Sequence, residues 1–227
     1  MVCAAVSKVH EQIKASGRPD IPLIWSEFNA TYANEQPITD STYEAPWMAD
    51  TIRQCDGKVD IMSYWSFSDV FEEQGVVKRP FYGGYGIVAE RGIPKPAFRA
   101  FEILHDLGDE RVAEPENDVL VTRRKDGTLV IALWNLIEPQ ATGPDKTFTL
   151  DIKGARGSRA TIRRVDATHG DTLDAWKQMG SPRYPTQAQI AALKKASEIG
   201  QPETVSLKVG QLTVTVPQRG LAVVEIR

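Results

Sequence analysis

Glu27 is the first side chain whose position suggests chemistry. It follows a short apolar run at residues 21–25, which has the length of a buried strand. In parallel α/β enzymes, reactive groups lie just beyond the carboxyl ends of such strands. A carboxylate there can act as a nucleophile, an acid or a base, whereas a single glutamate in a loop is more often only solvated. The pattern alone leaves both interpretations open.

The next apolar run, residues 59–65, predicts a second strand and is followed by two further candidates. Trp65 lies at its end, where an aromatic ring can stack on a sugar, although on spacing alone a core tryptophan is the commoner case. Glu72 and Glu73 form an acidic pair in the loop beyond. Adjacent carboxylates can accept hydrogen bonds from sugar hydroxyls, but most such pairs are simply solvated.

The elements that would position these residues alternate between helix and strand. Apolar residues at helical spacing predict helices at 6–15, 43–55 and 96–107, around the two strands. Buried strands separated by helices favour a parallel sheet. Periodicity does not decide between a doubly wound sheet and part of a barrel.

From about residue 112 the pattern changes to short strands with turns between them. An antiparallel β-sandwich is expected from these runs, and Lys125-Asp126-Gly127 is a hairpin signal between the first two. One helix at 187–198 interrupts them, and Thr186 and Gln189 have the spacing of a capping box at its start. The boundary between the two halves is expected within residues 108–116. The seven predicted strands are 119–123, 128–134, 147–152, 160–165, 204–209, 212–216 and 221–226.

Composition excludes several classes of protein. The chain has 227 residues, 41% of them hydrophobic and 25% charged, and a net charge of −3 without a basic stripe. Nucleic acid is therefore not an expected partner. No apolar run reaches the roughly 18 residues that cross a bilayer, so no membrane span is expected. Residues 1–10 lack the pattern of a signal peptide, and both bacterial cytoplasm and periplasm remain compatible with the sequence.

Cysteine and histidine usage indicates neither a disulfide framework nor a metal site. Cys3 and Cys55 are too few for a framework and are expected to be semi-buried thiols. The three histidines lie far apart and have no metal-ligand spacing. No metal and no cofactor are expected.

Several strings resemble glycoside hydrolase family 39, and in particular its β-xylosidases. The string IWSEFN at 24–29, followed by Tyr32, is similar to the strand that carries the family's nucleophile. The string SYWSFSDVFEE at 63–73 is similar to the last barrel strand and its loop, and is the more specific match. The resemblance runs from about residue 21 to residue 185. Shorter matches are FYGGYGI at 81–87, IPKP at 93–96, VTRRKDG at 121–127, LWN at 133–135 and WKQMG at 176–180.

The resemblance implies hydrolysis of terminal β-D-xylosyl residues of xylo-oligosaccharides, or of an aryl xyloside, with retention of configuration. Glu27 would be the catalytic nucleophile that forms a covalent xylosyl-enzyme. Related barrels also lead us to expect a cis peptide between Trp65 and Ser66. The implied substrate-binding residues are Trp65, Glu72, Glu73, Asn29 and Tyr32.

The resemblance also implies that only part of the family's fold is present. Glu27 and Trp65 match the seventh and eighth strands of a (β/α)8 TIM barrel, which takes about 250 residues when complete, and only 26 residues precede Glu27. We therefore expect a partial TIM-barrel catalytic domain at 1–110 and a β-sandwich accessory domain at 111–227. The acid/base glutamate is expected outside this chain, so the isolated chain is expected to be inactive. The missing barrel segment and a second copy of the chain are candidate protein partners.

One nearby glutamate invites a wrong assignment. Asn34-Glu35 is the dipeptide in which many barrel glycosidases carry the acid/base. It lies in the same loop as Glu27, whereas a retaining pair faces each other across the sugar, about 5–5.5 Å apart. We expect Glu35 to be a surface loop residue.

Two other functions remain as alternatives. An α-L-iduronidase-like glycosidase would share the family and the nucleophile. A non-catalytic β-sandwich that binds carbohydrate or a partner protein would present a flat row of exposed aromatic side chains. The candidates for such a row are Trp134, Trp176 and Tyr184.

Overall fold

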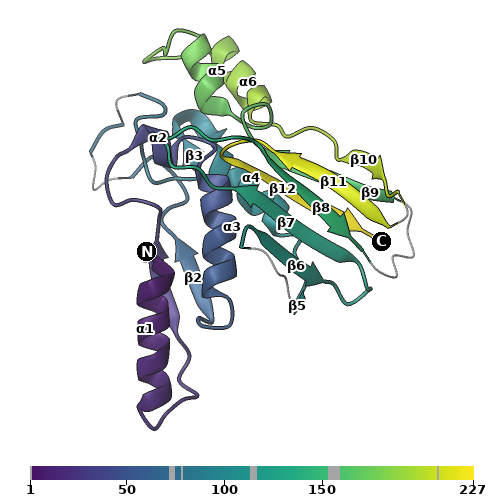
Figure 1. Ribbon diagram of the computed structural model, residues 1–227. Helices are drawn as coiled ribbons and strands as arrows, with labels where there is room; N and C mark the ends of the chain where they lie inside the picture. Colours follow the sequence, from purple (N-terminus) through teal and green to yellow (C-terminus); the bar gives the residue numbers. More distant parts are fainter. Residues whose placement is uncertain (1, 72–74, 78, 113–116, 153–158, 209) are drawn as a thin grey trace.

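The computed structural model describes residues 2–71, 75–77, 79–112, 117–152, 159–208 and 210–227. The chain builds a parallel strand pair with helices, followed by antiparallel sheets (Figure 1). The first half contains α1 (Val2–Ala15), β1 (Ile24–Phe28), α2 (Gln36–Thr39), α3 (Glu44–Cys55), β2 (Ile61–Tyr64), β3 (Val88–Ala89), η2 (Glu90–Gly92), β4 (Ile93–Pro94) and α4 (Pro96–Leu104). The second half contains β5 (Glu110–Val112), β6 (Val119–Arg123), β7 (Leu129–Asn135), β8 (Lys146–Asp151), β9 (Arg159–Val165), α5 (Thr172–Gln178), α6 (Gln187–Ala196), β10 (Glu203–Ser206), β11 (Gln211–Val216) and β12 (Gly220–Ile226).

Strands β1 and β2 form a parallel pair connected through α3, which confirms the expected parallel strands. Ile24 lies opposite Ile61, and these two side chains are 58% and 54% exposed. The register shifts between Trp25 and Phe28, where β1 has one residue more than the matching stretch of β2. Such a bulge changes the direction of the side chains that follow it. It falls on the segment that contains Glu27.

Helices α3 and α4 pack against one face of a six-stranded antiparallel sheet with the order β10-β9-β12-β7-β6-β5. Figure 1 shows α3 standing between β2 and this sheet. Met48 of α3 and Ala100 of α4 belong to the same buried core as Trp134 of β7 and Val223 of β12. The two halves of the chain therefore share one continuous apolar core.

The other face of the six-stranded sheet is covered by the antiparallel pair β8 and β11. Every second residue of β11 is buried, as expected for a strand with one face on a core. Phe148 and Val214 of this pair belong to the same core as Leu133 and Val224 of the larger sheet. The expected antiparallel strands of the second half are confirmed, and the strand expected at 204–209 ends at Ser206.

Helices α5 and α6 lie together at one end of the molecule, at the top of Figure 1. The capping box expected at Thr186 and Gln189 is confirmed at the start of α6. Helix α5 was not expected from the sequence, although Asp171 caps it by accepting a hydrogen bond from the backbone N–H of Asp174. Trp176 of α5 packs with Phe81 in a third core.

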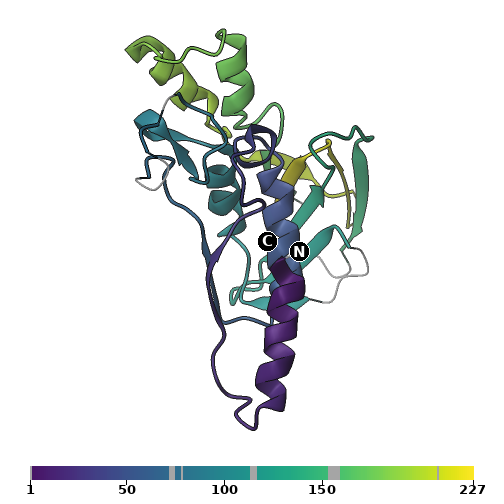
Figure 2. The same ribbon diagram turned by 90° about the vertical axis from the view of Figure 1, so that its left-hand side faces the viewer.

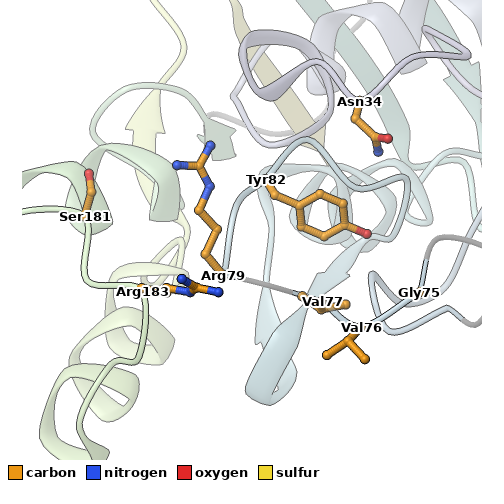
Figure 3. A pocket seen from close by; sticks show the side chains of 8 residues that line it. All are labelled: Asn34, Gly75, Val76, Val77, Arg79, Tyr82, Ser181 and Arg183. Atoms are coloured by element: carbon orange, nitrogen blue, oxygen red, sulfur yellow. The ribbon is translucent and has the colours of Figure 1, made fainter.

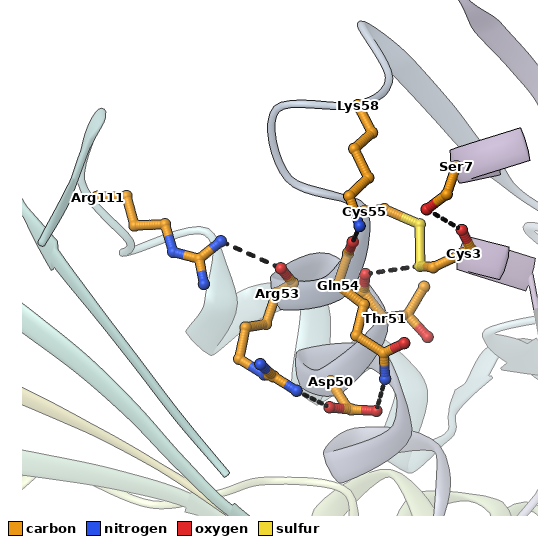
Figure 4. Close-up of a disulfide and its surroundings, with 9 residues drawn as sticks. All are labelled: Cys3, Ser7, Asp50, Thr51, Arg53, Gln54, Cys55, Lys58 and Arg111. Atoms are coloured by element: carbon orange, nitrogen blue, oxygen red, sulfur yellow. Dashed lines mark hydrogen bonds and ion pairs between the residues drawn. A yellow bond between two sulfur atoms is a disulfide. The ribbon is translucent and has the colours of Figure 1, made fainter. Parts of the chain in front are cut away.

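The expectation of free thiols is wrong, because Cys3 and Cys55 form a disulfide (Figure 4). The bond joins the first turn of α1 to the last turn of α3, across 52 positions of sequence. Cys3, Val6 and Cys55 are buried together, so the packing of α1 on α3 brings the two sulfur atoms into contact. The remaining length of α1 extends away from the sheets (Figure 2). Among the described residues, no helix has the length and apolar character needed to span a membrane.

Candidate functional site

Four of the six site residues expected from the sequence line one cavity. The cavity has a volume of about 560 Å³ and lies at the carboxyl ends of β1 and β2. Glu27 and Asn29 reach it from the end of β1, Tyr32 from the loop that follows, and Trp65 from the end of β2. The bulge in β1 lies at Glu27 itself, between Trp25 and Phe28, and bulges are common beside active sites.

Hydrogen bonds tie the segments around this cavity to one another. The side-chain amide of Asn29 donates to the carbonyl oxygen of Trp65 at 2.5 Å and to that of Tyr85 at 3.3 Å. The hydroxyl of Tyr85 donates to the carbonyl oxygen of Tyr32 at 2.6 Å. Tyr85 also lines the cavity. Tyr85 belongs to the FYGGYGI string, in which no pattern indicates a contact with residues near Glu27.

Trp65 has a defined environment. Its ring is half-buried and meets Phe71 edge-on, with the two ring centroids 5.2 Å apart. The peptide between Trp65 and Ser66 is cis, as the family resemblance led us to expect. Tyr32, by contrast, is 97% exposed, so its ring has little protein around it in this chain.

The remaining expected residues are not brought to the cavity. Glu72 and Glu73 lie outside the described residues. Glu35 is absent from the described lining of the cavity, and its carboxylate accepts a 2.5 Å hydrogen bond from the Thr31 hydroxyl. No group of three or more histidine, cysteine or acidic side chains among the described residues could hold a metal ion.

A group of buried ionisable side chains lies on or against the segments that line the cavity. Lys95 is fully buried and is paired with Asp40 and Asp69. Burial raises the pKa of Asp69 to about 6, against the attraction of Lys95. Burial likewise raises the pKa of Glu44 to about 8, and Lys95 again opposes the change. Burial also raises the pKa of Tyr64, with the Glu44 charge adding to the effect.

A second cavity of about 760 Å³ has a different lining (Figure 3). Arg79 and Arg183 lie on the side of Ser181, and Val76 is on the opposite side. The residues that the structure describes in its lining include Asn34 but no carboxylate and no tryptophan.

The aromatic side chains considered for a carbohydrate-binding sandwich do not form an exposed row. Trp134 is 0% and Trp176 is 2% exposed, and each belongs to a core. Tyr184 alone of the three is exposed, at 73%. A flat binding platform made of these three residues is therefore ruled out.

The chain belongs to glycosyl hydrolases family 39, whose family model matches residues 1–210. The resemblance drawn from the sequence strings is thus confirmed. A β-xylosidase from Geobacillus stearothermophilus is 39% identical over 190 residues, which make up 83% of this chain and 37% of that protein. One from Caldicellulosiruptor saccharolyticus is 33% identical over 188 residues, 79% of this chain and 38% of that protein. The chain thus spans less than half the length of these relatives.

Solved structures show the same relationship. A monomeric β-xylosidase from Caulobacter crescentus CB15 matches with a TM-score of 0.86 and 25% identity, over 100% of this chain and 49% of that one. A bacterial orthologue of human α-L-iduronidase matches with a TM-score of 0.69 over 96% of this chain and 44% of that one. At 18% identity this second likeness shows the fold alone.

Proposed function

We propose that this chain carries the nucleophile side of a retaining β-xylosidase site, with Glu27 as the nucleophile and xylo-oligosaccharides as the substrates of the whole enzyme. The observation that carries the proposal is the shared cavity of Glu27 and Trp65 at the carboxyl ends of two parallel strands. Family membership and two relatives named β-xylosidase support the choice of sugar.

In the proposed reaction, a carboxylate oxygen of Glu27 forms a bond to the anomeric carbon while the bond to the leaving oxygen breaks. The leaving oxygen takes a proton from a general acid on the other side of the sugar. Among the described lining residues, Glu27 is the only carboxylic acid, so we place the acid/base in a part of the enzyme outside this chain. Removing a general acid typically costs about 10²–10⁴-fold in rate.

We further propose that residues 1–110 are the end of a (β/α)8 barrel and residues 111–227 an accessory β-sandwich. The β1–α3–β2 connection is the repeating unit of such a barrel, and β5, from Glu110, joins the antiparallel sheet. The exposed pair Ile24 and Ile61 is then a face that the preceding barrel segment would cover. That segment is accordingly the protein partner we favour over a second copy of the chain.

A comparison of two leaving groups tests this function. Dinitrophenolate is a weak base and departs without a proton, whereas the leaving sugar of xylobiose needs one. The isolated chain is not expected to turn over substrate. We do expect it to release dinitrophenolate slowly from 2,4-dinitrophenyl β-D-xyloside, in a single burst of at most one equivalent, because no base assists hydrolysis of the intermediate. The chain should leave xylobiose intact, and Glu27→Gln should abolish the burst. Cleavage of xylobiose, or a burst that survives in Glu27→Gln, would refute the proposal.

A further inference from the structure

Lys95 is a charged residue in the interior of the protein that the proposed reaction does not use. Its side chain is 0% exposed and its ammonium group has three partners. It donates to Asp40 at 2.6 Å, to Asp69 at 2.9 Å and to the carbonyl oxygen of Gly84 at 2.8 Å. Asp40 and Asp69 oppose the effect of burial and raise the pKa of Lys95, so the ammonium remains charged.

The three partners of Lys95 belong to three different segments, each of which supplies a residue of the Glu27 cavity. Asp40 lies at the end of the segment 29–40, which also contains the cavity residues Asn29 and Tyr32. Asp69 lies four positions after Trp65, and Gly84 immediately precedes Tyr85. One ammonium group therefore connects the three segments that supply Tyr32, Trp65 and Tyr85 to the cavity.

The aspartates extend these connections to the backbone. Asp40 accepts a 2.7 Å hydrogen bond from the N–H of Gly83, and Asp69 accepts one of 2.8 Å from the N–H of Gly86. Between these glycines, the carbonyl oxygen of Tyr85 accepts a 2.8 Å hydrogen bond from the N–H of Ser66. A shift of the Lys95 ammonium would thus be transmitted to the peptide that follows Trp65.

The packing around these groups leaves little freedom for an alternative arrangement. A Cβ atom on Gly84 would lie 2.4 Å from a carboxylate oxygen of Asp69. A buried ion pair is in general weak evidence for stability, because desolvation offsets its attraction, whereas its fixed geometry can specify one conformation. Lys95, Asp40 and Asp69 have the fixed geometry that specifies one conformation.

We propose that Lys95 is a positioning residue for the glycoside cavity, holding the segments of Tyr32, Trp65 and Tyr85 in register through Asp40 and Asp69. The proposal rests on the proposed function for the identity of the cavity's ligand. The positioning role does not depend on catalysis by the isolated chain, because the predicted effect is a change in the position of the Trp65 side chain.

The indole N–H signals of the five tryptophans, observed by 15N–1H NMR on the full chain, provide the test. Trp65→Phe assigns the Trp65 signal, and the buried Trp134 and Trp176 serve as internal reporters of the intact core. Asp69→Asn is the decisive variant, because it keeps the shape of the side chain and removes its charge. Asp118→Asn is the matched control, since it removes an aspartate that pairs with Lys146.

We expect Asp69→Asn to shift or broaden the Trp65 signal while Trp134 and Trp176 keep their positions, and Asp118→Asn to leave Trp65 unchanged. Lys95→Met should displace Trp65 further; if this variant does not fold, Asp69→Asn decides alone. A folded Asp69→Asn chain with Trp65 at its original position would overturn the proposal. Titration of the unsubstituted chain with methyl β-D-xyloside separates the positioning role of Lys95 from the proposed function. A Trp65 signal that does not shift when the sugar is added would count against the proposed function only.

Discussion

Asn29 donates a 2.5 Å hydrogen bond from its side-chain amide to the carbonyl oxygen of Trp65. Asn29 lies two positions after Glu27, and Trp65 directly follows the neighbouring parallel strand β2. The bond therefore fixes the spacing between the segment of the proposed nucleophile and the ring proposed to hold the sugar. It links the ends of β1 and β2 beyond the last residues of their ladder.

Replacing this donor should disturb the cavity. In Asn29→Asp, an acceptor oxygen would face the carbonyl oxygens of Trp65 and Tyr85 in place of the NH2 group. The half-buried carbonyl oxygen of Trp65 would lose its donor. A lost partner of this kind costs about 1–3 kcal/mol, and we expect a loss of that size in the free energy of unfolding, measured with urea. The exposed Asn117→Asp should change stability by less than about 0.5 kcal/mol. Equal effects of the two substitutions would show that the Asn29 amide does not bind as described.

Glu44 should make the stability of the chain decrease as the pH rises. Burial raises its pKa from 4.5 to about 8. Between these values the folded chain keeps a proton that the unfolded chain has released, so the free energy of unfolding falls with rising pH. Glutamine has no proton to release, so the free energy of unfolding of Glu44→Gln should not fall in this way. Between pH 5 and pH 8 the free energy of unfolding of the variant should rise by about 3 kcal/mol relative to that of the unsubstituted chain, since one pKa unit corresponds to about 1.4 kcal/mol.

Urea unfolding at several pH values measures this difference. Asp69, whose pKa is raised to about 6, adds a slope of the same sign below that pH, and the slope should persist in Glu44→Gln. Glu11 is exposed on α1, so Glu11→Gln is the matched control and should follow the unsubstituted chain. A Glu44→Gln chain with the same pH dependence as the unsubstituted chain would show that Glu44 is ionised in the folded state.

A side chain at position 86 should reduce the stability of the chain. A Cβ atom there would lie 2.2 Å from the backbone nitrogen of Asp69, which cannot move independently of its segment. Overpacking of this kind typically costs about 1–3 kcal/mol, and Gly86→Ala should lose stability in that range in thermal or urea unfolding. In Gly143→Ala the nearest atom, at 2.9 Å, is the end of the flexible Ile137 side chain, so little loss is expected. The prediction fails if Gly86→Ala is as stable as Gly143→Ala.

The disulfide should contribute measurably to stability. It closes a long loop, because Cys3 and Cys55 are separated by 52 in sequence, and cross-links of this kind typically stabilise by about 2–4 kcal/mol. The double variant with Cys3→Ser and Cys55→Ser should lose that amount in urea unfolding. Adding a reductant to the unsubstituted chain should reproduce the loss and leave the double variant unaffected. A reductant effect of the same size in both proteins would exclude the disulfide as its source.

Local patterns predicted most of the elements and two of the residues that line the cavity, whereas Asn29 and Tyr32 came from the family resemblance. The apolar periodicity of α3 and the alternation of β11 are properties of contiguous residues, so they could be recognised without a structure. Glu27 and Trp65 were candidates because each follows an apolar strand, and they do line one cavity. Their roles as nucleophile and sugar platform came from the family resemblance and stay predictions.

The features that were missed depend on contacts between distant segments. Cys3 and Cys55 pair because α1 packs on α3, which no local pattern reveals. Lys95 lies between two prolines in the IPKP string, which gives no sign of burial, yet it is buried between Asp40 and Asp69, 55 and 26 positions away in sequence. Tyr85 likewise reaches the cavity through its hydrogen bond to Tyr32, 53 positions away.

The central claim, that Glu27 is the nucleophile, is tested most directly by covalent trapping. A 2-deoxy-2-fluoro-β-xyloside with a dinitrophenolate leaving group needs no general acid to react, and the fluorine slows breakdown of the glycosyl-enzyme. Mass spectrometry of the chain after incubation should show the mass of one fluoroxylosyl group per molecule, located by peptide mapping on Glu27 and absent from the Glu27→Gln variant. No adduct, an adduct on Glu35, or labelling that persists in Glu27→Gln would contradict the account.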